Sequence, residues 1–255
     1  MPICMLAAVV LCAAGPTWGD VEFVEFPEFR YTSALPGGGW GVMPTGEPGF
    51  DGALQINVPV AYTPHEGFII GYSSGSFSTT PKLAFSGAGS NGTATLAAGF
   101  GRPGRGIYVC EMGTSSKWEP AENIQVQIRA EEDKWPAVAI GLQDIFGHRD
   151  RATTPGYAHH TESPYVVATR QMAVGERTAY LTLGLGWGRF HSGPFAGVSY
   201  RASEKVTAMA EYDGYSANVG AALDLSSIIA EHTTAFVGLV DLDRTVIGLT
   251  YVHRQ

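Results

Sequence analysis

The stretch Asn123-Ile124-Gln125-Val126-Gln127-Ile128-Arg129-Ala130-Glu131-Glu132 decides the fold. From Ile124 to Glu131, apolar and polar side chains alternate without a break. Successive side chains of a strand point to opposite faces, so one face here is apolar and the other carries polar and charged groups. The polar face consists of Gln125, Gln127, Arg129 and Glu131. The stretch therefore predicts a two-faced β-strand.

The same alternation returns about every ten residues along the chain, and turn-forming residues such as Arg102-Pro103-Gly104 separate the segments. The expected strands lie near 52–60, 67–73, 80–86, 93–100, 105–113, 123–132, 136–145, 163–171, 178–188, 194–202, 205–213, 216–224, 233–241 and 244–252. Strands joined by short turns form an antiparallel meander. No composition shift divides residues 20–255, so we expect a single all-β domain.

Composition supports an all-β fold. The chain has 255 residues with 33 glycines, and only 16% of its residues are charged. Each glycine inside a helix costs about 1 kcal/mol, so a helical bundle is disfavoured. A hydrophobic content of 45% argues against a disordered chain, which needs low hydrophobicity and high net charge.

The chemistry of the two faces favours a membrane barrel over a soluble sandwich. One face carries Val, Ile, Leu, Ala and aromatic residues, and the other carries mostly Gln, Thr, Gly, Ser and Asn. Strands of about 9–11 residues with this alternation suit a barrel whose apolar face meets lipid. We therefore expect an antiparallel meander closed into an outer-membrane β-barrel of about 12–14 strands. A secreted β-sandwich or jelly roll that binds or cleaves carbohydrate is the alternative.

The first fifty residues predict export and a lumenal segment. Residues 1–19 carry no charged side chain and contain an apolar run from Ile3 to Ala14, which is typical of a secretory signal peptide. Residues 20–50 include Pro36-Gly37-Gly38-Gly39 and are expected to form a loop or a plug-like segment. The sequence leaves open whether this segment closes the barrel.

Charge and cysteine content narrow the ligand classes. A formal net charge of −8 and the absence of a basic run argue against a nucleic-acid partner. Removal of the signal would leave Cys110 without a cysteine partner, so we expect neither an internal disulfide nor a cysteine metal site. His148, His159 and His160 fall in a polar loop without metal-ligand spacing, and no metal ion or cofactor is expected.

Two further patterns have a simpler explanation than chemistry. Gly87 to Gly92 has the spacing of a dinucleotide fingerprint, but the β-branched residues that follow favour a hairpin turn. The pairs Glu131 with Asp144 and Glu211 with Asp213 could hydrolyse a glycoside if their carboxylates lay about 5–9 Å apart. We expect these acids to line a polar lumen instead, and we predict no catalytic residue.

Two stretches of the chain carry a family resemblance: Trp135-Pro136-Ala137-Val138-Ala139-Ile140-Gly141-Leu142-Gln143-Asp144-Ile145 and Thr182-Leu183-Gly184-Leu185-Gly186-Trp187-Gly188-Arg189. Both resemble segments of the YjbH family. Ser163 to Arg170, Ala210 to Gly214 and Asn218 to Gly220 also agree, so that the resemblance spans about residues 50–225. It implies an outer-membrane barrel associated with bacterial exopolysaccharide production, with no established catalytic residues to carry over.

The resulting hypothesis is a non-catalytic structural or conduit protein of exopolysaccharide export. Its expected partners are outer-membrane lipid, polysaccharide and other secretion proteins. The candidate lumen residues that would contact glycan are Gln125, Gln127, Arg129, Glu131, Glu211 and Asp213. The alternatives are a carbohydrate-binding or carbohydrate-cleaving sandwich and a general diffusion porin.

Overall fold

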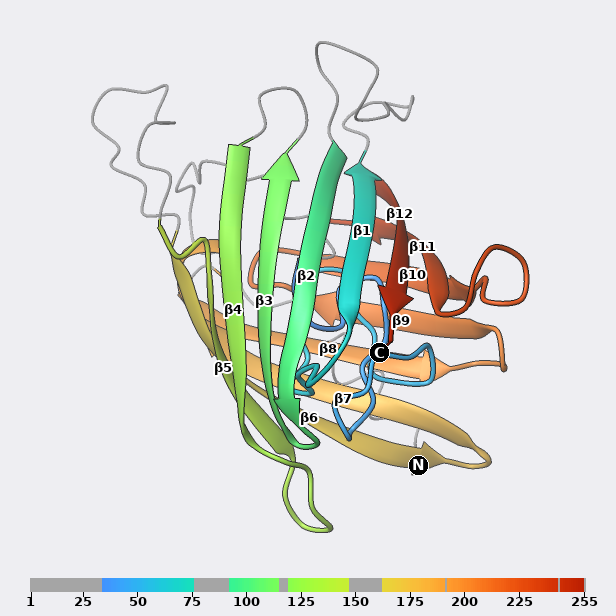
Figure 1. Ribbon diagram of the computed structural model, residues 1–255. Coiled ribbons are helices and arrows are strands. Elements are labelled where there is room, and N and C mark those ends of the chain that lie inside the picture. Colours follow the sequence, from blue (N-terminus) through green and yellow to red (C-terminus); the bar gives the residue numbers. More distant parts are fainter. Residues whose placement is uncertain are drawn as a thin grey trace.

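The computed structural model describes residues 34–75, 92–114, 119–146, 162–190, 192–242 and 244–254 (Figure 1). Twelve strands form within these ranges: β1 Phe68–Gly75, β2 Gly92–Arg102, β3 Arg105–Thr114, β4 Glu119–Arg129, β5 Ala137–Gln143, β6 Ser163–Val174, β7 Arg177–Gly186, β8 Gly193–Arg201, β9 Val206–Tyr212, β10 Ala217–Asp224, β11 Thr233–Val240 and β12 Arg244–His253. A short 3₁₀ helix, η3, covers Gly188–Phe190. None of the described residues belongs to a helix that is long and apolar enough to cross a membrane.

Each strand pairs antiparallel with the next, and β1 closes the sheet by pairing with β12. In the closing seam, Ile70 lies opposite Tyr251 and Tyr72 lies opposite Leu249. Closure gives the backbone groups of every strand a neighbour on both sides, which removes the exposed sheet edge. The expected all-β antiparallel barrel is confirmed, with twelve strands among the described residues. The expected strand at 80–86 lies outside them.

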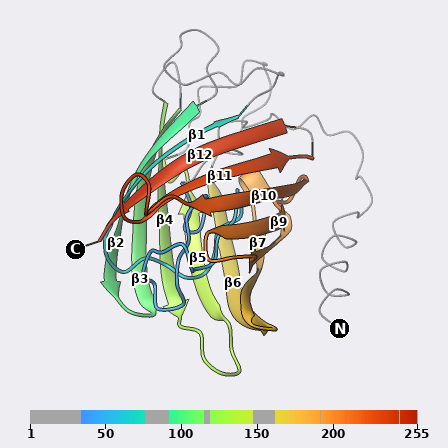
Figure 2. The ribbon, with the colours of Figure 1, turned by 90° about the vertical axis from the view of Figure 1, so that its right-hand side faces the viewer.

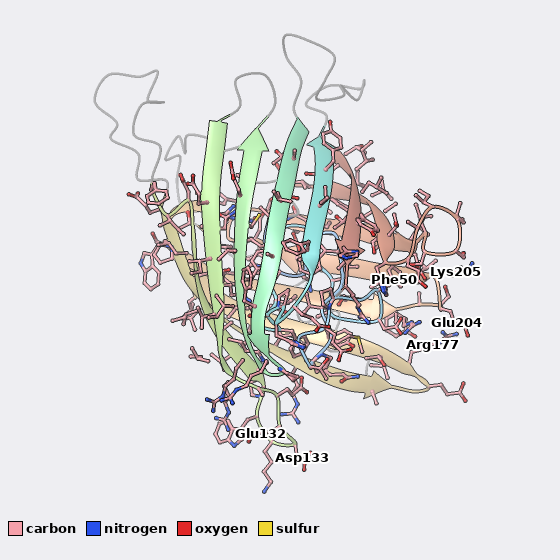
Figure 3. The ribbon with its side chains drawn as sticks, in the orientation of Figure 1. Phe50, Glu132, Asp133, Arg177, Glu204 and Lys205 are labelled. Atoms are coloured by element: carbon pink, nitrogen blue, oxygen red, sulfur yellow. The ribbon has the colours of Figure 1, made fainter. Side chains whose placement is uncertain are left out.

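The two ends of the barrel differ. At the proximal end the chain enters β1 through Gly67 and leaves β12, and the turns at 103–104, 175–176 and 202–205 lie there. At the distal end lie η3 and the turn at 213–216. Figure 3 shows the labelled charged side chains Glu132, Asp133, Arg177, Glu204 and Lys205 at the tips of proximal turns.

The outer wall is apolar, as the alternation predicts. Along β4 the inward-facing Gln125 and Gln127 are buried, whereas Ile128 on the outer face is 55% exposed. The wall presents large apolar side chains on most strands. They include Phe68, Ile70, Leu96, Phe100, Ile107, Val109, Ile140, Val166, Leu183, Leu185, Val219, Leu223, Val237, Leu239, Ile247, Leu249 and Tyr251.

A segment from 34 to 66, here called the plug, fills the lumen. Figure 2 shows this blue segment inside the ring of strands. Its large side chains Trp40, Leu54, Ile56 and Tyr62 are at most 1% exposed. The plug has only short backbone pairing of its own, such as the two reciprocal hydrogen bonds between Val42 and Ala53 of 3.0 and 2.9 Å.

The expected strand at 52–60 is wrong, because these residues belong to the plug. They form isolated bridges, such as Gln55 with Gly38, and no strand. The stretch is rich in apolar residues because the barrel surrounds it on all sides, and not because one face of it packs in a sheet. Burial alone produces the same apolar run in a core strand and in a buried irregular segment.

Candidate functional site: a polar lumen occupied by the plug

Side chains of the barrel wall take the place of a neighbouring strand for the plug backbone. Gln125 on β4 donates from Nε2 to the Val60 carbonyl at 2.9 Å. The Gln127 carbonyl oxygen accepts the Thr63 amide at 3.1 Å. Buried amides and carbonyls need such partners, because an unpaired one costs about 1–3 kcal/mol. The lumen is therefore matched to this particular backbone.

Two wall hydroxyls serve the same purpose. Thr169 Oγ1 on β6 accepts the Ala61 amide at 2.8 Å, and Ser199 Oγ on β8 accepts the Leu54 amide at 3.2 Å. Both wall residues are fully buried. Polar residues from the three strands β4, β6 and β8 thus bind the plug backbone between residues 54 and 63.

Glu211 on β9 makes the most concentrated contact with the plug. Its Oε2 accepts the Ile56 amide at 2.9 Å and the Val58 amide at 3.3 Å, and its Oε1 accepts the Asn57 amide at 2.8 Å. A carboxylate accepts hydrogen bonds without donating any, so it suits three backbone donors that point the same way.

Asn218 on β10 positions this carboxylate. Its Nδ2 donates to Glu211 Oε1 and to Asp213 Oδ2, at 3.0 Å each. Asp213 also accepts the amides of Tyr215 and Ser216 at 3.0 Å, which fixes the distal turn between β9 and β10. Asp213 therefore supports Glu211 through Asn218 and shapes the rim.

Arg189 in η3 reaches the plug from the distal rim. Its guanidinium donates to the Asn57 carbonyl at 2.6 Å and to Gln143 Oε1 at 2.9 Å. Burial lowers the pKa of the Arg189 guanidinium, while the carboxylates of Asp213 and Glu211 act in the opposite direction. A buried cation thus faces the two buried acids across the tip of the plug.

Glu131 and Arg129 lie at the proximal end of the barrel. Glu131 accepts the hydroxyl of Tyr62 and, with both oxygens, the Gln171 amide at 3.1 Å. Burial raises the pKa of the Tyr62 hydroxyl well above its usual value, and the hydrogen bond to Glu131 acts in the same direction. The Arg129 side chain is 39% exposed, pairs with Glu132 at 3.5 Å and lies over the Trp135 ring.

The structure therefore divides the six predicted lumen residues. Gln125, Gln127 and Glu211 bind the plug backbone, and Asp213 supports Glu211 through Asn218. Glu131 binds a plug side chain, and Arg129 lies at the half-exposed proximal rim. Their predicted contact with glycan stays a prediction. Arg189, Thr169 and Ser199 were not among the candidates.

The carboxylate pairs have different arrangements. Glu131 and Asp144 lie at opposite ends of the barrel, because β5 separates the proximal loop from the distal one. Glu211 and Asp213 both accept hydrogen bonds from the Asn218 side chain, and Glu211 also binds the plug backbone. Within the described ranges, no three histidine, cysteine or acidic side chains are grouped to hold a metal ion. His148, His159, His160 and Gly87 to Asn91 lie outside those ranges.

Glycines of the wall make room for the plug. A Cβ atom on Gly197 would lie 2.7 Å from the Gln55 carboxamide, and one on Gly238 would lie 2.8 Å from Ile56 Cδ1. A Cβ on Gly106 would collide with the Thr63 carbonyl oxygen. The plug thus touches the wall where the wall has no side chain.

These features define a class: a closed antiparallel β-barrel with an apolar outer wall and a polar lumen occupied by its own N-terminal segment. The family model described as "YjbH: Exopolysaccharide biosynthesis protein YbjH" matches residues 37–238. The chain belongs to this family, and the resemblance noted in the sequence is confirmed. The match begins within the plug and ends in β11, so it covers the lumen contacts described above.

The comparisons with solved structures and with curated sequences give no information on function. Among solved structures, the crystal structure of the Acinetobacter baumannii outer membrane protein Omp33 is similar, with a TM-score of 0.40 and 10% sequence identity. The alignment covers 74% of this chain and 98% of that one. At this level of similarity, we carry nothing over from Omp33. No curated protein sequence matches the chain.

Proposed function

We propose that this protein is an outer-membrane barrel that acts without catalysis in the production and export of exopolysaccharide. The observation that carries the proposal is the apolar outer wall of a closed barrel in a chain of the YjbH family. A closed barrel pairs the backbone groups of its strands internally, which is the condition for crossing a bilayer with strands.

The distribution of charge supports a membrane location. Large apolar side chains such as Leu96, Leu183 and Val237 are 47–57% exposed on the outer faces of their strands. The charged groups labelled in Figure 3 project from the proximal turns. An apolar band bounded by a polar rim matches the hydrocarbon core and headgroup regions of a bilayer. Outer-membrane lipid is therefore the expected partner of the wall.

The lumen offers donors and acceptors of the kind that hydroxyl-rich polymers need. Gln125 and Gln127 carry both functions on one carboxamide. With the plug in place, however, these groups bind the backbone of residues 60–63. A conduit role therefore requires the plug to move, whereas a structural role in a complex with other secretion proteins does not.

The barrel and its plug argue against the two alternative functions in different ways. The closed twelve-strand barrel excludes the β-sandwich that would bind or cleave carbohydrate. A general diffusion porin needs an open lumen, and residues 34–66 occupy the lumen here. The plug therefore favours a protein whose lumen is closed at rest.

The first experiment compares boiled and unboiled samples of the outer-membrane fraction by gel electrophoresis. We expect the protein in that fraction, with a faster-migrating unboiled form that marks a closed barrel. Deletion of the gene should then lower extracellular polysaccharide, and re-expression of the wild-type chain should restore it. A protein recovered in the soluble fraction without a heat-induced shift would overturn the membrane proposal. Unchanged polysaccharide in the deletion strain would overturn the export role.

A further inference from the structure

The plug is held differently at its two ends. Near the proximal end, its contacts come from several independent groups of the rim. Arg254 Nε donates to the Pro48 carbonyl at 2.8 Å, Arg201 pairs with Asp51 at 2.5 Å, and the Gly104 amide donates to the Thr45 carbonyl at 3.0 Å. Loss of any one of these contacts leaves the others in place.

The distal part of the plug, residues 54–58, is here called the tip. Three consecutive amides of the tip, from Ile56 to Val58, depend on the single carboxylate of Glu211. The Glu211 side chain is itself held through Asn218. One side chain therefore accepts three hydrogen bonds from the tip, more than any other wall residue, while Ser199 and Arg189 each make one further contact with the tip backbone.

The seated tip also leaves buried polar groups without a hydrogen-bond partner among the described residues. Both side-chain polar atoms of Gln55 and both of Asn57 are unpaired, and each residue is at most 1% exposed. On the facing wall, Gln143 Nε2 and Asn123 Nδ2 are unpaired as well. Each such group is destabilising when buried, because water would satisfy it in the unseated state.

The backbone of the tip and the carboxamides of the wall form one connected layer. Arg189 joins the backbone carbonyl of Asn57 to Gln143 Oε1, and Gln143 lies directly opposite Asn123 in the β4–β5 register. This layer belongs to the distal end of the barrel. Displacement of the tip would open these amides toward the distal side while the proximal attachments remain.

Apolar contacts of the tip oppose displacement. Leu54 and Ile56 belong to a buried cluster with Met209, Phe236 and Val246, Val58 belongs to the other buried cluster, and Ile56 sits against Gly238. The seated state is thus stabilised by the Glu211 carboxylate, by the contacts of Ser199 and Arg189, and by buried apolar side chains, of which Ile56 reaches the wall at Gly238. The buried unpaired amides act against these contacts.

We propose that the tip is a displaceable gate latched by Glu211, and that its displacement exposes the carboxamides of Asn57, Asn123 and Gln143 as binding groups for the hydroxyls of a polysaccharide. Amide groups donate and accept hydrogen bonds, as sugar hydroxyls do, without adding charge. The identity of the ligand rests on the proposed function. The gate itself rests on the lumen geometry alone.

The gate is tested on the purified full chain by labelling of a cysteine at the tip. Asn57→Cys is introduced with Cys4, Cys12 and Cys110 replaced by alanine, and a water-soluble maleimide is added. We expect Glu211→Gln, which keeps the shape of the side chain and loses its charge, to raise the labelling rate at least tenfold. The control Asp224→Asn removes a carboxylate that bonds Ser226 in the proximal turn, and it should not change the rate. Equal rates in the Glu211→Gln and parent proteins would overturn the gate.

Conductance in planar bilayers gives a second readout with a second variant. Ile56→Ala leaves the wall unchanged and should raise the open probability, as Glu211→Gln should. It therefore keeps the test decisive if Glu211→Gln fails to assemble. Wild-type conductance in an assembled Ile56→Ala barrel would count against the gate. Neutral dextran oligomers should block the current of the opened barrel, and Gln143→Leu should weaken that block at least threefold.

Absence of block would overturn the sugar-binding part of the proposal. Failure of the export role is distinguishable from failure of the gate, since labelling and conductance need no exported polymer. A gate that opens in vitro, in a protein whose deletion leaves polysaccharide unchanged, would separate the two proposals.

Discussion

Arg189 connects the tip of the plug to the distal rim through two hydrogen bonds of its guanidinium group. We expect Arg189→Ala to lower the free energy of unfolding by about 3 kcal/mol, because it leaves the Asn57 carbonyl and the Gln143 oxygen without this donor and removes a buried cation that faces two acids. Urea unfolding of the barrel in lipid vesicles measures the change.

Arg129→Ala is the matched control for Arg189→Ala. The Arg129 side chain is 39% exposed and its pair with Glu132 is a surface contact, so its loss should cost about 1 kcal/mol or less. If both arginine variants unfolded at the same urea concentration, the buried network of Arg189 would contribute nothing particular to stability.

Gln125 shows how a single carboxamide can hold three partners at once. It donates to the Val60 carbonyl and to Thr63 Oγ1, at 2.9 and 2.7 Å, and it accepts the Tyr165 hydroxyl at 2.8 Å. Gln125→Leu keeps the approximate volume of the side chain. It leaves the Val60 carbonyl, Thr63 Oγ1 and the Tyr165 hydroxyl without this hydrogen-bond partner. We expect a loss of about 1–3 kcal/mol in the same urea assay. Tyr165→Phe removes only one of the bonds and should cost less; a larger loss than in Gln125→Leu would contradict this assignment.

The residues of the lumen differ in how predictable they were. Gln125, Gln127 and Glu211 lie at the polar positions of strands in which polar and apolar residues alternate. Side chains of a strand alternate between its two faces, so the sequence predicts that these three point inward. Arg189 lies in the turn that contains η3, where no periodicity indicates a direction. Its burial depends on the tip of the plug, a contact between residues far apart in the chain that no local pattern specifies.

At the scale of the element, a substitution on β7 tests whether the outer wall faces lipid or water. Leu183 is 53% exposed on its outer face. In water, an arginine there would change stability little. In a bilayer, we expect Leu183→Arg to cost about 2–4 kcal/mol, because a charge near the midplane must leave water. Refolding yield in lipid vesicles, followed by the heat-induced gel shift, measures the loss.

The control is Leu242→Arg. Leu242 is 58% exposed in the turn between β11 and β12, so its exposure matches that of Leu183 while its position is outside the strands. We expect this variant to assemble like the wild type. Equal assembly of the two arginine variants would contradict a lipid-facing β7.

The strands and the plug also differ in how well the sequence predicts their structure. Twelve of the expected strands were placed within a few residues, since each has a wall face and a lumen face of different polarity. The segment 52–60 has no such contrast, because the barrel surrounds it. Its backbone partners are side chains such as Ser199 and Glu211, which stand about 150 positions away in the sequence. A sequence pattern can show that such a segment is buried, but not that it lacks a strand.

At the scale of the whole molecule, closure through β1 and β12 joins the first and last strands of the sheet into one barrel. Ile70 and Tyr251 are register partners across this seam, and both are exposed on the outer face. Directly opposite residues of antiparallel strands lie about 4.5–5.5 Å apart, within the range of a disulfide. Ile70→Cys with Tyr251→Cys should therefore cross-link under mild oxidation, and the boiled non-reduced sample should migrate differently from the reduced one.

The pair Ile70→Cys with Val237→Cys tests whether that cross-link reports closure. Val237 is exposed on β11, and β12 lies between it and β1, so a closed barrel holds these two positions too far apart to bond. We expect no cross-link within the chain for this pair. Cross-linking of both pairs would mean that the seam opens and the strands sample one another. Cross-linking of the first pair alone would show that the ring is complete, which is the condition for a lumen that a plug can close.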